Sequence, residues 1–408
     1  MRHRLSESDP VGWILGVADS TDFVDRHLGS SWHHATCDDR DRFAQLLSLT
    51  ELDEILGTYG IRHPDIKLVK LEEEIPRSEY LWRDDLVDPL QVGRLFAAGA
   101  TVIFGALHDR HEGLRRLCSA TTRQVGARTQ TNIYLTPPSS QGFRPHWDTH
   151  DVFVLQVEGG KRWRIYGGGP HRPTRDQKFH PEQHDVGEVE AELTLRAGEV
   201  LYIPRGIMPA AETTDEISLH ITLGVMSYTW ADLLSDCLSE LVERSPELRA
   251  NVPFGLGRGA EEGAVEREVA ELVARLPAEI DLTRVLRERR DAFASFLRPR
   301  ATDALRQATA AGAVASDDTI EWRSGLAGRV ERRNGRVVLR TASREVDFPA
   351  AASDALEAVV DAGPILAGDV EDGLDWESRR VVLSTLIREG LIARIPDPAS
   401  PSTPEENR

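Results

Sequence analysis

A histidine and an aspartate two residues apart are the first candidates for chemistry in this sequence. His146 and Asp148 flank a tryptophan within RPHWDTHDVFVLQVEGGKRWRIY, residues 144–166. On a β-strand, residues two apart point to the same face, so this imidazole and carboxylate can converge on one metal ion. They form two thirds of the 2-His-1-carboxylate triad that holds Fe(II) and leaves coordination positions open. An isolated pair of this kind is usually structural, so the surrounding sequence decides whether it is interpreted as a metal site.

The surrounding segments predict closely spaced β-strands. The strand-like runs are TQTNIYLTPP, DVFVLQVEG, KRWRIYGG, AELTLRAGEVLYIPRG and EISLHITLGV. Gly and Pro clusters separate them, which is typical of antiparallel strands in a barrel or sandwich. Upstream, short helical patterns alternate with the strand-like segments DIKLVKLEEE and ATVIFGAL. We therefore expect residues 1–229 to form a barrel domain with an N-terminal α/β elaboration.

The pattern changes after this barrel. Apolar residues at helical spacing predict a helical module over residues 230–312, and pairing of two copies through it is a hypothesis. Residues 313–396 contain RVERRNGRVVLRT, whose Asn-Gly pair predicts a hairpin, followed by two helical segments. That order resembles a winged helix. The segment 397–408 is rich in Pro, Ser and Glu and is expected to be a disordered tail.

Composition narrows the classes of function. A length of 408 residues favours two or three domains. The net charge of -18 disfavours nucleic-acid binding and suits a basic protein or peptide partner, although it is also a common way to stay soluble. A DNA-binding winged helix ranks low, because acidic residues dilute the arginines of its predicted hairpin. We expect a cytoplasmic protein, since no apolar run approaches the roughly 20 residues of a membrane span and the N-terminus lacks a signal core.

The chain resembles the cupin-like JmjC oxygenases, which include the ribosomal oxygenases. The resemblance rests on TNIYLTPPSSQGFRPHWDTHDVFVLQVEGGKRWRIY, GEVLYIPRG and SLHITLGV, and on the order of the predicted modules. It implies a mainly β fold with α elements, a double-stranded β-helix followed by a helical module and a winged-helix domain. It also implies that His146 and Asp148 bind iron and that Lys161 pairs with the distal carboxylate of 2-oxoglutarate.

The activity implied is hydroxylation of a histidine or arginine side chain by Fe(II), 2-oxoglutarate and dioxygen, with a ribosomal protein or a peptide as substrate. A dianionic co-substrate in a partly dry barrel needs a cation, which Lys161 can supply. Asn132 and Tyr134 alternate on the preceding strand, so both can face the interior and bind the co-substrate. Tyr134 is equally well explained as a core tyrosine with a satisfied hydroxyl.

The sequence departs from the family pattern at the third metal ligand. The family has a histidine a few residues after the PRG motif, whereas this chain reads PRGIMPAA over residues 204–211, with Pro209 in its place. Three explanations stay open. His220 could supply the missing imidazole to the metal. Alternatively, the histidine-aspartate pair could bind metal with 2-oxoglutarate and water in a weak or altered enzyme, or the barrel could be a catalytically silent binding module.

Other histidines give weaker signals. His150 would share a strand face with His146, and contact with substrate or with Asp151 is its expected role. Three more histidines lie in the polar insertion GGGPHRPTRDQKFHPEQHD, where a solvated loop is the simplest interpretation.

Overall fold

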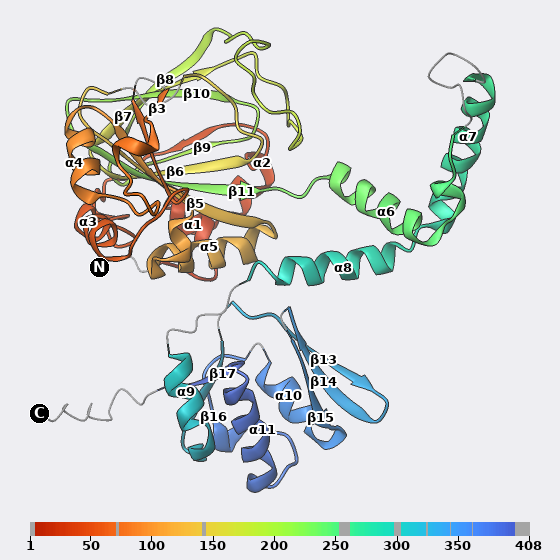
Figure 1. Ribbon diagram of the computed structural model, residues 1–408. Helices are drawn as coiled ribbons and strands as arrows, with labels where there is room; N and C mark the ends of the chain where they lie inside the picture. Colours follow the sequence, from red (N-terminus) through yellow and green to blue (C-terminus); the bar gives the residue numbers. More distant parts are fainter. Residues whose placement is uncertain are drawn as a thin grey trace, which may run out of the picture. The chain divides into compact units, whose positions relative to one another are not determined.

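The computed structural model describes two compact units, 1–227 and 228–408, which we treat separately (Figure 1). The residues that the structure describes are 5–70, 73–140, 144–252, 262–297, 303–323, 325–342, 344–360 and 362–395. The expected disordered tail lies outside them. Along these ranges no helix is both long enough and apolar enough to cross a bilayer.

Over its described residues, the first unit contains eleven strands in two antiparallel sheets. They are β1 (His33–Ala35), β2 (Ile66–Lys70), β3 (Glu73–Glu74), β4 (Thr101–Phe104), β5 (Arg128–Thr136), β6 (Asp151–Glu158), β7 (Gly160–Tyr166), β8 (Val189–Arg196), β9 (Val200–Ile203), β10 (Met208–Thr213) and β11 (Ser218–Met226). The larger sheet has the order β1-β9-β6-β11-β5-β4-β2-β3, and the smaller has the order β10-β7-β8. This arrangement confirms the predicted barrel of closely spaced strands.

Helices pack against one face of the larger sheet. They are α1 (Pro10–Leu15), α2 (Thr21–Arg26), α3 (Leu49–Thr58), α4 (Pro89–Ala97) and α5 (Glu112–Val125). Helix α3 begins with a capping box, in which Ser48 and Glu51 each bind the other's backbone N–H. Helix α5 ends at Gly126, whose φ of 65° is the left-handed conformation that glycine adopts without strain. These local signals fix where the helical layer begins and ends.

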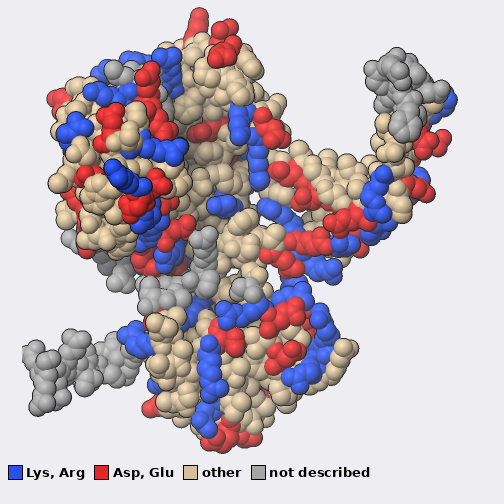
Figure 2. Space-filling model, viewed as in Figure 1, with Lys and Arg blue, Asp and Glu red and all other residues tan. Residues whose placement is uncertain are grey.

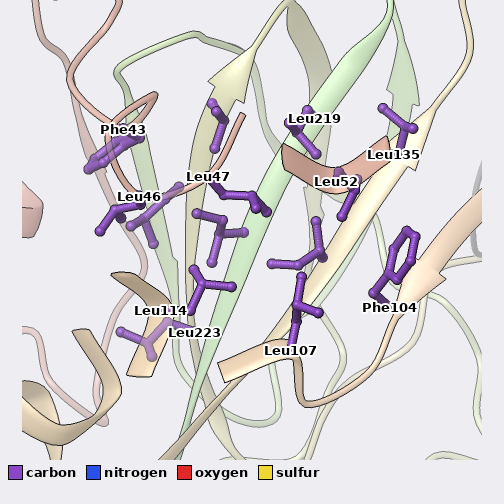
Figure 3. Close-up of a cluster of buried hydrophobic side chains, with 14 of the residues drawn as sticks. Phe43, Leu46, Leu47, Leu52, Phe104, Leu107, Leu114, Leu135, Leu219 and Leu223 are labelled. Atoms are coloured by element: carbon purple, nitrogen blue, oxygen red, sulfur yellow. The ribbon is translucent and has the colours of Figure 1, made fainter. Parts of the chain in front are cut away.

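The strands of the larger sheet divide their side chains between two environments. On β5, Ile133 and Leu135 join the main apolar core, whereas Asn132 and Tyr134 face a cavity. The same alternation runs along β11. Figure 3 shows this core from the inside, where Leu219 and Leu223 of β11 lie among leucines from the helical layer. Because one face is filled by apolar packing, the alternate polar residues are directed into the barrel interior.

Strand β6 is buried on both faces. Phe153 and Leu155 belong to the main core, whereas Val152 and Val154 belong to a second apolar cluster that also includes Trp163 and Ile165 of β7. This double burial explains why the sequence of the strand is an almost continuous apolar run instead of an alternating one.

The second unit begins with helices. They are α6 (Trp230–Arg244), α7 (Glu262–Glu279), α8 (Leu282–Ala294) and α9 (Ala304–Ala310). Helix α6 buries Cys237 and Leu241 but exposes Trp230, Leu234 and Leu238 along the stripe of every fourth residue. The pairing hypothesis for this module therefore stays a prediction, for which this stripe is the candidate surface.

The rest of the second unit is an α/β assembly with its own apolar core. Its elements are β12 (Thr319–Trp322), β13 (Gly328–Arg333), β14 (Arg336–Thr341), β15 (Glu345–Pro349), α10 (Ser353–Val359), β16 (Ile365–Leu366), α11 (Trp376–Arg388) and β17 (Ile392–Ile395). The predicted hairpin is confirmed, because Asn334 and Gly335 join β13 to β14 with φ values of 51° and 73°. The winged-helix assignment stays a hypothesis.

Charge is spread over the surface. On the face shown in Figure 2, Lys and Arg side chains are interspersed with Asp and Glu side chains. Mixed charge of this kind promotes solubility, and the predicted absence of a nucleic-acid partner stays a prediction.

Candidate active site

A cavity of about 200 Å³ lies in the barrel and is lined by side chains of both sheets. It contains most of the residues singled out from the sequence. Its lining is Thr101, Asn132, Tyr134, His146, Asp148, His150, Val152, Val154, Lys161, Trp163, Ile203, Pro204, Ile207, Pro209, Ala210, Ala211, His220 and Thr222. The chain thus brings polar groups far apart in sequence into one partly apolar space, which is the usual form of a small-molecule site.

His146 and Asp148 line this cavity together, as predicted, but they do not lie on a strand. They occupy the connection between β5 and β6. The backbone carbonyl of Asp148 accepts a hydrogen bond from Gly206 N at 3.1 Å, and His146 Nδ1 lies 2.8 Å from the carbonyl oxygen of Arg144. Donation from Nδ1 leaves the lone pair on Nε2, the tautomer in which a histidine binds metal through that atom.

Trp147, between the two candidate ligands, is buried against the insertion that joins β7 to β8. Its Nε1 donates to the carbonyl oxygen of Gln177 at 3.0 Å. Phe179 and His184 pack edge-on against its ring, with centroids 4.9 and 4.5 Å away. The insertion that was interpreted as a solvated loop therefore holds the turn bearing His146 and Asp148, a role that no local sequence signal indicated.

Lys161 lies on β7, in the smaller sheet. Its side chain is only 4% exposed. Burial lowers the pKa of Lys161 from 10.5 to about 7, and no carboxylate in the described ranges forms an ion pair with it. A buried ammonium without a counter-ion is costly, so a ligand carboxylate at this position would offset a large desolvation penalty.

His220 and Tyr134 face the cavity side by side. They are directly paired between β11 and β5, and their rings are stacked with centroids 4.9 Å apart. Burial and the nearby positive charge of Lys161 hold the pKa of His220 well below its usual range, so this imidazole is neutral. Burial, reinforced by Asp148, raises the pKa of Tyr134 well above its usual range.

Asn132 also lines the cavity, but part of its amide group has a structural task. Its Oδ1 accepts a hydrogen bond from Ala106 N at 3.2 Å. Ala106 has a φ of 49°, an uncommon conformation for alanine, and this bond stabilises the turn after β4. The side chain is therefore fixed in position at the cavity wall.

One further cavity residue was missed from the sequence. Trp163 follows Lys161 at the next inward position of β7, and its buried Nε1 has no hydrogen-bond partner in the described part of the chain. Buried His220 Nδ1 is also without such a partner there. The alternation in KRWRIY could have indicated Trp163, because residues two apart share a face. Both unpaired nitrogens offer hydrogen-bonding capacity to a ligand.

Pro209 lines the cavity on β10, where it is paired with Ile165 of β7. Strand β10 is at the edge of its sheet, a position that tolerates proline. Within the described ranges, no group of three or more His, Cys, Asp or Glu side chains is placed to hold a metal ion. His220 is therefore not gathered with His146 and Asp148 into a group of three ligands, which is the arrangement that the first of the three open explanations requires. The donors present fit a metal bound by one imidazole and one carboxylate.

The chain is similar to known proteins over most of the residues that line the cavity. Residues 108–233 match the model of the JmjC domain, and this range contains the whole cavity lining except Thr101. This part of the chain is therefore similar to the JmjC domain. Human ribosomal oxygenase 1 is 35% identical over 239 residues, which cover 54% of this chain and 35% of that protein.

A second relative and the solved structures extend the comparison. The bifunctional lysine-specific demethylase and histidyl-hydroxylase NO66 of Culex quinquefasciatus is 30% identical over 261 residues, which cover 61% of this chain and 40% of that protein. The chain thus spans less than half the length of these relatives. Escherichia coli ycfD shares its fold with a TM-score of 0.53 and 19% identity, covering 97% of this chain and 100% of that one. A ycfD structure with cobalt and 2-oxoglutarate gives a TM-score of 0.52 at 19% identity, covering 92% and 98%.

Proposed function

We propose that this protein is a 2-oxoglutarate-dependent oxygenase that hydroxylates a side chain of a protein or peptide. The single observation that carries the proposal is Lys161, a buried lysine that forms no ion pair with any described carboxylate and lines the same cavity as His146 and Asp148. A dicarboxylate is the ligand that would satisfy such a cation while leaving its other end near the metal ligands. The solved ycfD structure with cobalt and 2-oxoglutarate supports the same pairing of metal and co-substrate.

His146 and Asp148 would hold Fe(II), and bound iron would supply the activation of dioxygen that accompanies decarboxylation of 2-oxoglutarate to succinate. The residues of the chain itself bind the co-substrate and exclude water. Lys161 binds the distal carboxylate, and the hydrogen-bonding groups of Tyr134 and Asn132 lie in the same cavity. The apolar side chains of β6 and β7 exclude water, which strengthens these electrostatic interactions.

The substrate we propose is a ribosomal protein, with a histidine or arginine side chain as the hydroxylated group. The relatives named ribosomal oxygenase 1 and histidyl-hydroxylase support this choice. The charge of -18 favours encounter with a basic polypeptide. Proteins that bind RNA are commonly basic. His150, at the cavity wall, is the candidate substrate contact of this chain.

A catalytically weak or silent binding protein is the alternative function. Pro209 favours it, because the described residues contribute only two donors to the candidate metal site. In that case the cavity would bind a dicarboxylate or a partner without turnover. The two functions make different predictions for succinate release.

Anaerobic titration of the full chain with Fe(II), with and without 2-oxoglutarate, tests the proposal through the metal-to-ligand charge-transfer absorption. Succinate release in air, with ribosomal proteins as substrate, then tests turnover. We expect a saturable band and succinate formation, both lost in His146→Ala and both retained in His171→Ala, a change at an exposed loop histidine. A folded protein that gives neither signal would leave only the binding function.

A further inference from the structure

The candidate metal site is supported by protein donors on only one side. His146 and Asp148 come from one connection, and the wall formed by Pro209, Ala210 and Ala211 has no side-chain donor. Proline contributes only an amide nitrogen, and alanine contributes a methyl group. No described carboxylate, imidazole or thiolate joins the pair to make a group of three.

The other histidines of the cavity are occupied elsewhere. His220 is stacked on Tyr134, with ring centroids 4.9 Å apart, and its ring meets that of Trp163 edge-on at 6.0 Å. His150 packs against β11, because a Cβ added to Gly224 would lie 2.9 Å from its Cδ2. Neither imidazole is therefore positioned as a third metal ligand.

We infer that a divalent metal and 2-oxoglutarate bind this protein cooperatively, because His146 and Asp148 need the 2-oxo acid to complete the coordination of the metal. The inference rests on the proposed function. A 2-oxo acid offers two oxygens in a chelating arrangement, which doubles the number of donors at the metal. With its far carboxylate held by Lys161, the chelating end is presented at a high effective concentration.

Linkage makes this coupling reciprocal. If 2-oxoglutarate raises the affinity for metal by some factor, the metal raises the affinity for 2-oxoglutarate by the same factor. A coupling of at least about tenfold is expected, within the usual range for linked ligands. A metal held by three protein ligands depends less on the co-substrate to complete its coordination. The coupling between metal affinity and 2-oxoglutarate affinity would therefore be weaker at such a site.

Calorimetric titration of the full chain with Mn²⁺ tests the inference without relying on turnover. Three conditions are compared: no ligand, saturating 2-oxoglutarate and saturating glutarate. Glutarate has the same two carboxylates but no 2-oxo group, so it can bind Lys161 and cannot chelate in the same way. We expect tight Mn²⁺ binding only with 2-oxoglutarate, and an equal gain in 2-oxoglutarate affinity when Mn²⁺ is saturating.

Two variants sharpen the test. Pro209→His faces the cavity from β10 and should raise the affinity for Mn²⁺ in the absence of 2-oxoglutarate, thereby reducing the coupling. His146→Ala should abolish the effect of Mn²⁺ on 2-oxoglutarate while leaving glutarate binding intact. Should Pro209→His fail to fold, the reciprocal titrations of the unaltered chain decide alone.

The outcomes also separate this inference from the proposed function. Equal Mn²⁺ affinity with and without 2-oxoglutarate, or an equal gain from glutarate, overturns the inference while leaving co-substrate binding in place. Absence of 2-oxoglutarate binding under all conditions overturns both the inference and the proposed function. Reciprocal gains that glutarate does not reproduce support the inference even if no succinate forms.

Discussion

The imidazole of His220 lies parallel to the phenol ring of Tyr134, with an angle of 2° between the ring planes. The two residues are direct cross-strand partners on β11 and β5. Aromatic pairs in this arrangement stabilise a sheet by roughly 0.2–1 kcal/mol. Since the imidazole is also buried, its packing alone accounts for its position in the barrel wall.

This packing predicts that His220→Phe folds normally and keeps the affinity for Mn²⁺ measured in the presence of 2-oxoglutarate. His220→Ala should instead lower the free energy of unfolding by roughly 1–3 kcal/mol, because it leaves a cavity. Urea denaturation and metal titration of both variants check these expectations. Loss of metal binding in a well-folded His220→Phe protein would identify this imidazole as a ligand after all.

Replacing Lys161 should have opposite effects on ligand binding and on stability. We expect Lys161→Met to reduce 2-oxoglutarate affinity at least a hundredfold, because the counter-ion of the distal carboxylate is gone. The free protein should gain roughly 1–3 kcal/mol, because an unpaired buried cation is replaced by an apolar chain of similar length. Thermal unfolding with and without 2-oxoglutarate measures both effects. Lys178→Met, at an exposed loop position, is the matched control and should change neither.

The pKa of Lys161 predicts how stability depends on pH. Its pKa is about 7 in the folded chain and 10.5 when unperturbed, so between these values the unfolded chain binds a proton that the folded chain does not. The contribution of Lys161 to stability therefore rises as pH increases from about 7 to 10.5, and it is constant below that window. Denaturation of the parent and of Lys161→Met across this range isolates the contribution as the difference between them.

The same shift predicts proton uptake when 2-oxoglutarate binds. The carboxylate needs a charged Lys161, so affinity should fall as pH rises above about 7, by at most about tenfold per pH unit. Calorimetry in buffers of different ionisation enthalpy counts the protons directly. Lys161→Arg should bind with no such pH dependence, because arginine stays protonated. Identical proton uptake in both proteins would assign the titration to another group.

Trp147 provides a test of how the metal ligands are positioned. Trp147→Ala removes the packing with Phe179 and the bond to Gln177, and it should weaken metal binding about 10–100-fold. Trp147→Phe keeps most of the packing and should therefore lose less metal affinity than Trp147→Ala. The ratio of the two metal affinities, measured with 2-oxoglutarate present, is the informative quantity. A purely structural residue would change the unfolding free energy and leave that ratio near one.

The exposed stripe on α6 predicts self-association of the chain. Trp230 is 80% exposed and Leu234 is 65% exposed, which is unusual for adjacent large apolar side chains on a helix. If two copies pair through this stripe, Leu234→Glu should yield a monomer in light-scattering measurements. Leu305→Glu, at a position on α9 that is even more exposed, should keep the parent's mass. A monomeric parent at all concentrations would rule out the pairing.

Local patterns predicted most of the barrel. Strands β5, β6 and β11 were expected because alternation or continuous apolar runs are properties of a few neighbouring residues. Strand β10 was missed, since MPAAET contains a proline and two alanines and has little intrinsic preference for a strand. Its position depends on pairing with β7, an interaction that no short window of sequence contains.

Part of the candidate site was also predictable from local sequence patterns. The pairing of His146 with Asp148 follows from their spacing, and both residues do line one cavity, although the backbone there is not a strand. The location of Lys161 in the opposite sheet was not predictable, because it depends on how the two sheets close over each other. The role of Trp147 depends on an insertion distant in sequence, so only the folded chain could reveal it.

Pro209 on the edge strand β10 has a consequence for the history of this chain. Each histidine codon becomes a proline codon by a single nucleotide change, so one point mutation can remove an imidazole at this wall of the cavity, and the reverse change can restore it. Because an edge strand is paired on one side only, it accommodates either residue. The dependence of metal binding on co-substrate is therefore a trait that a lineage can acquire or lose in one mutational step, while the barrel and its helical layer stay unchanged.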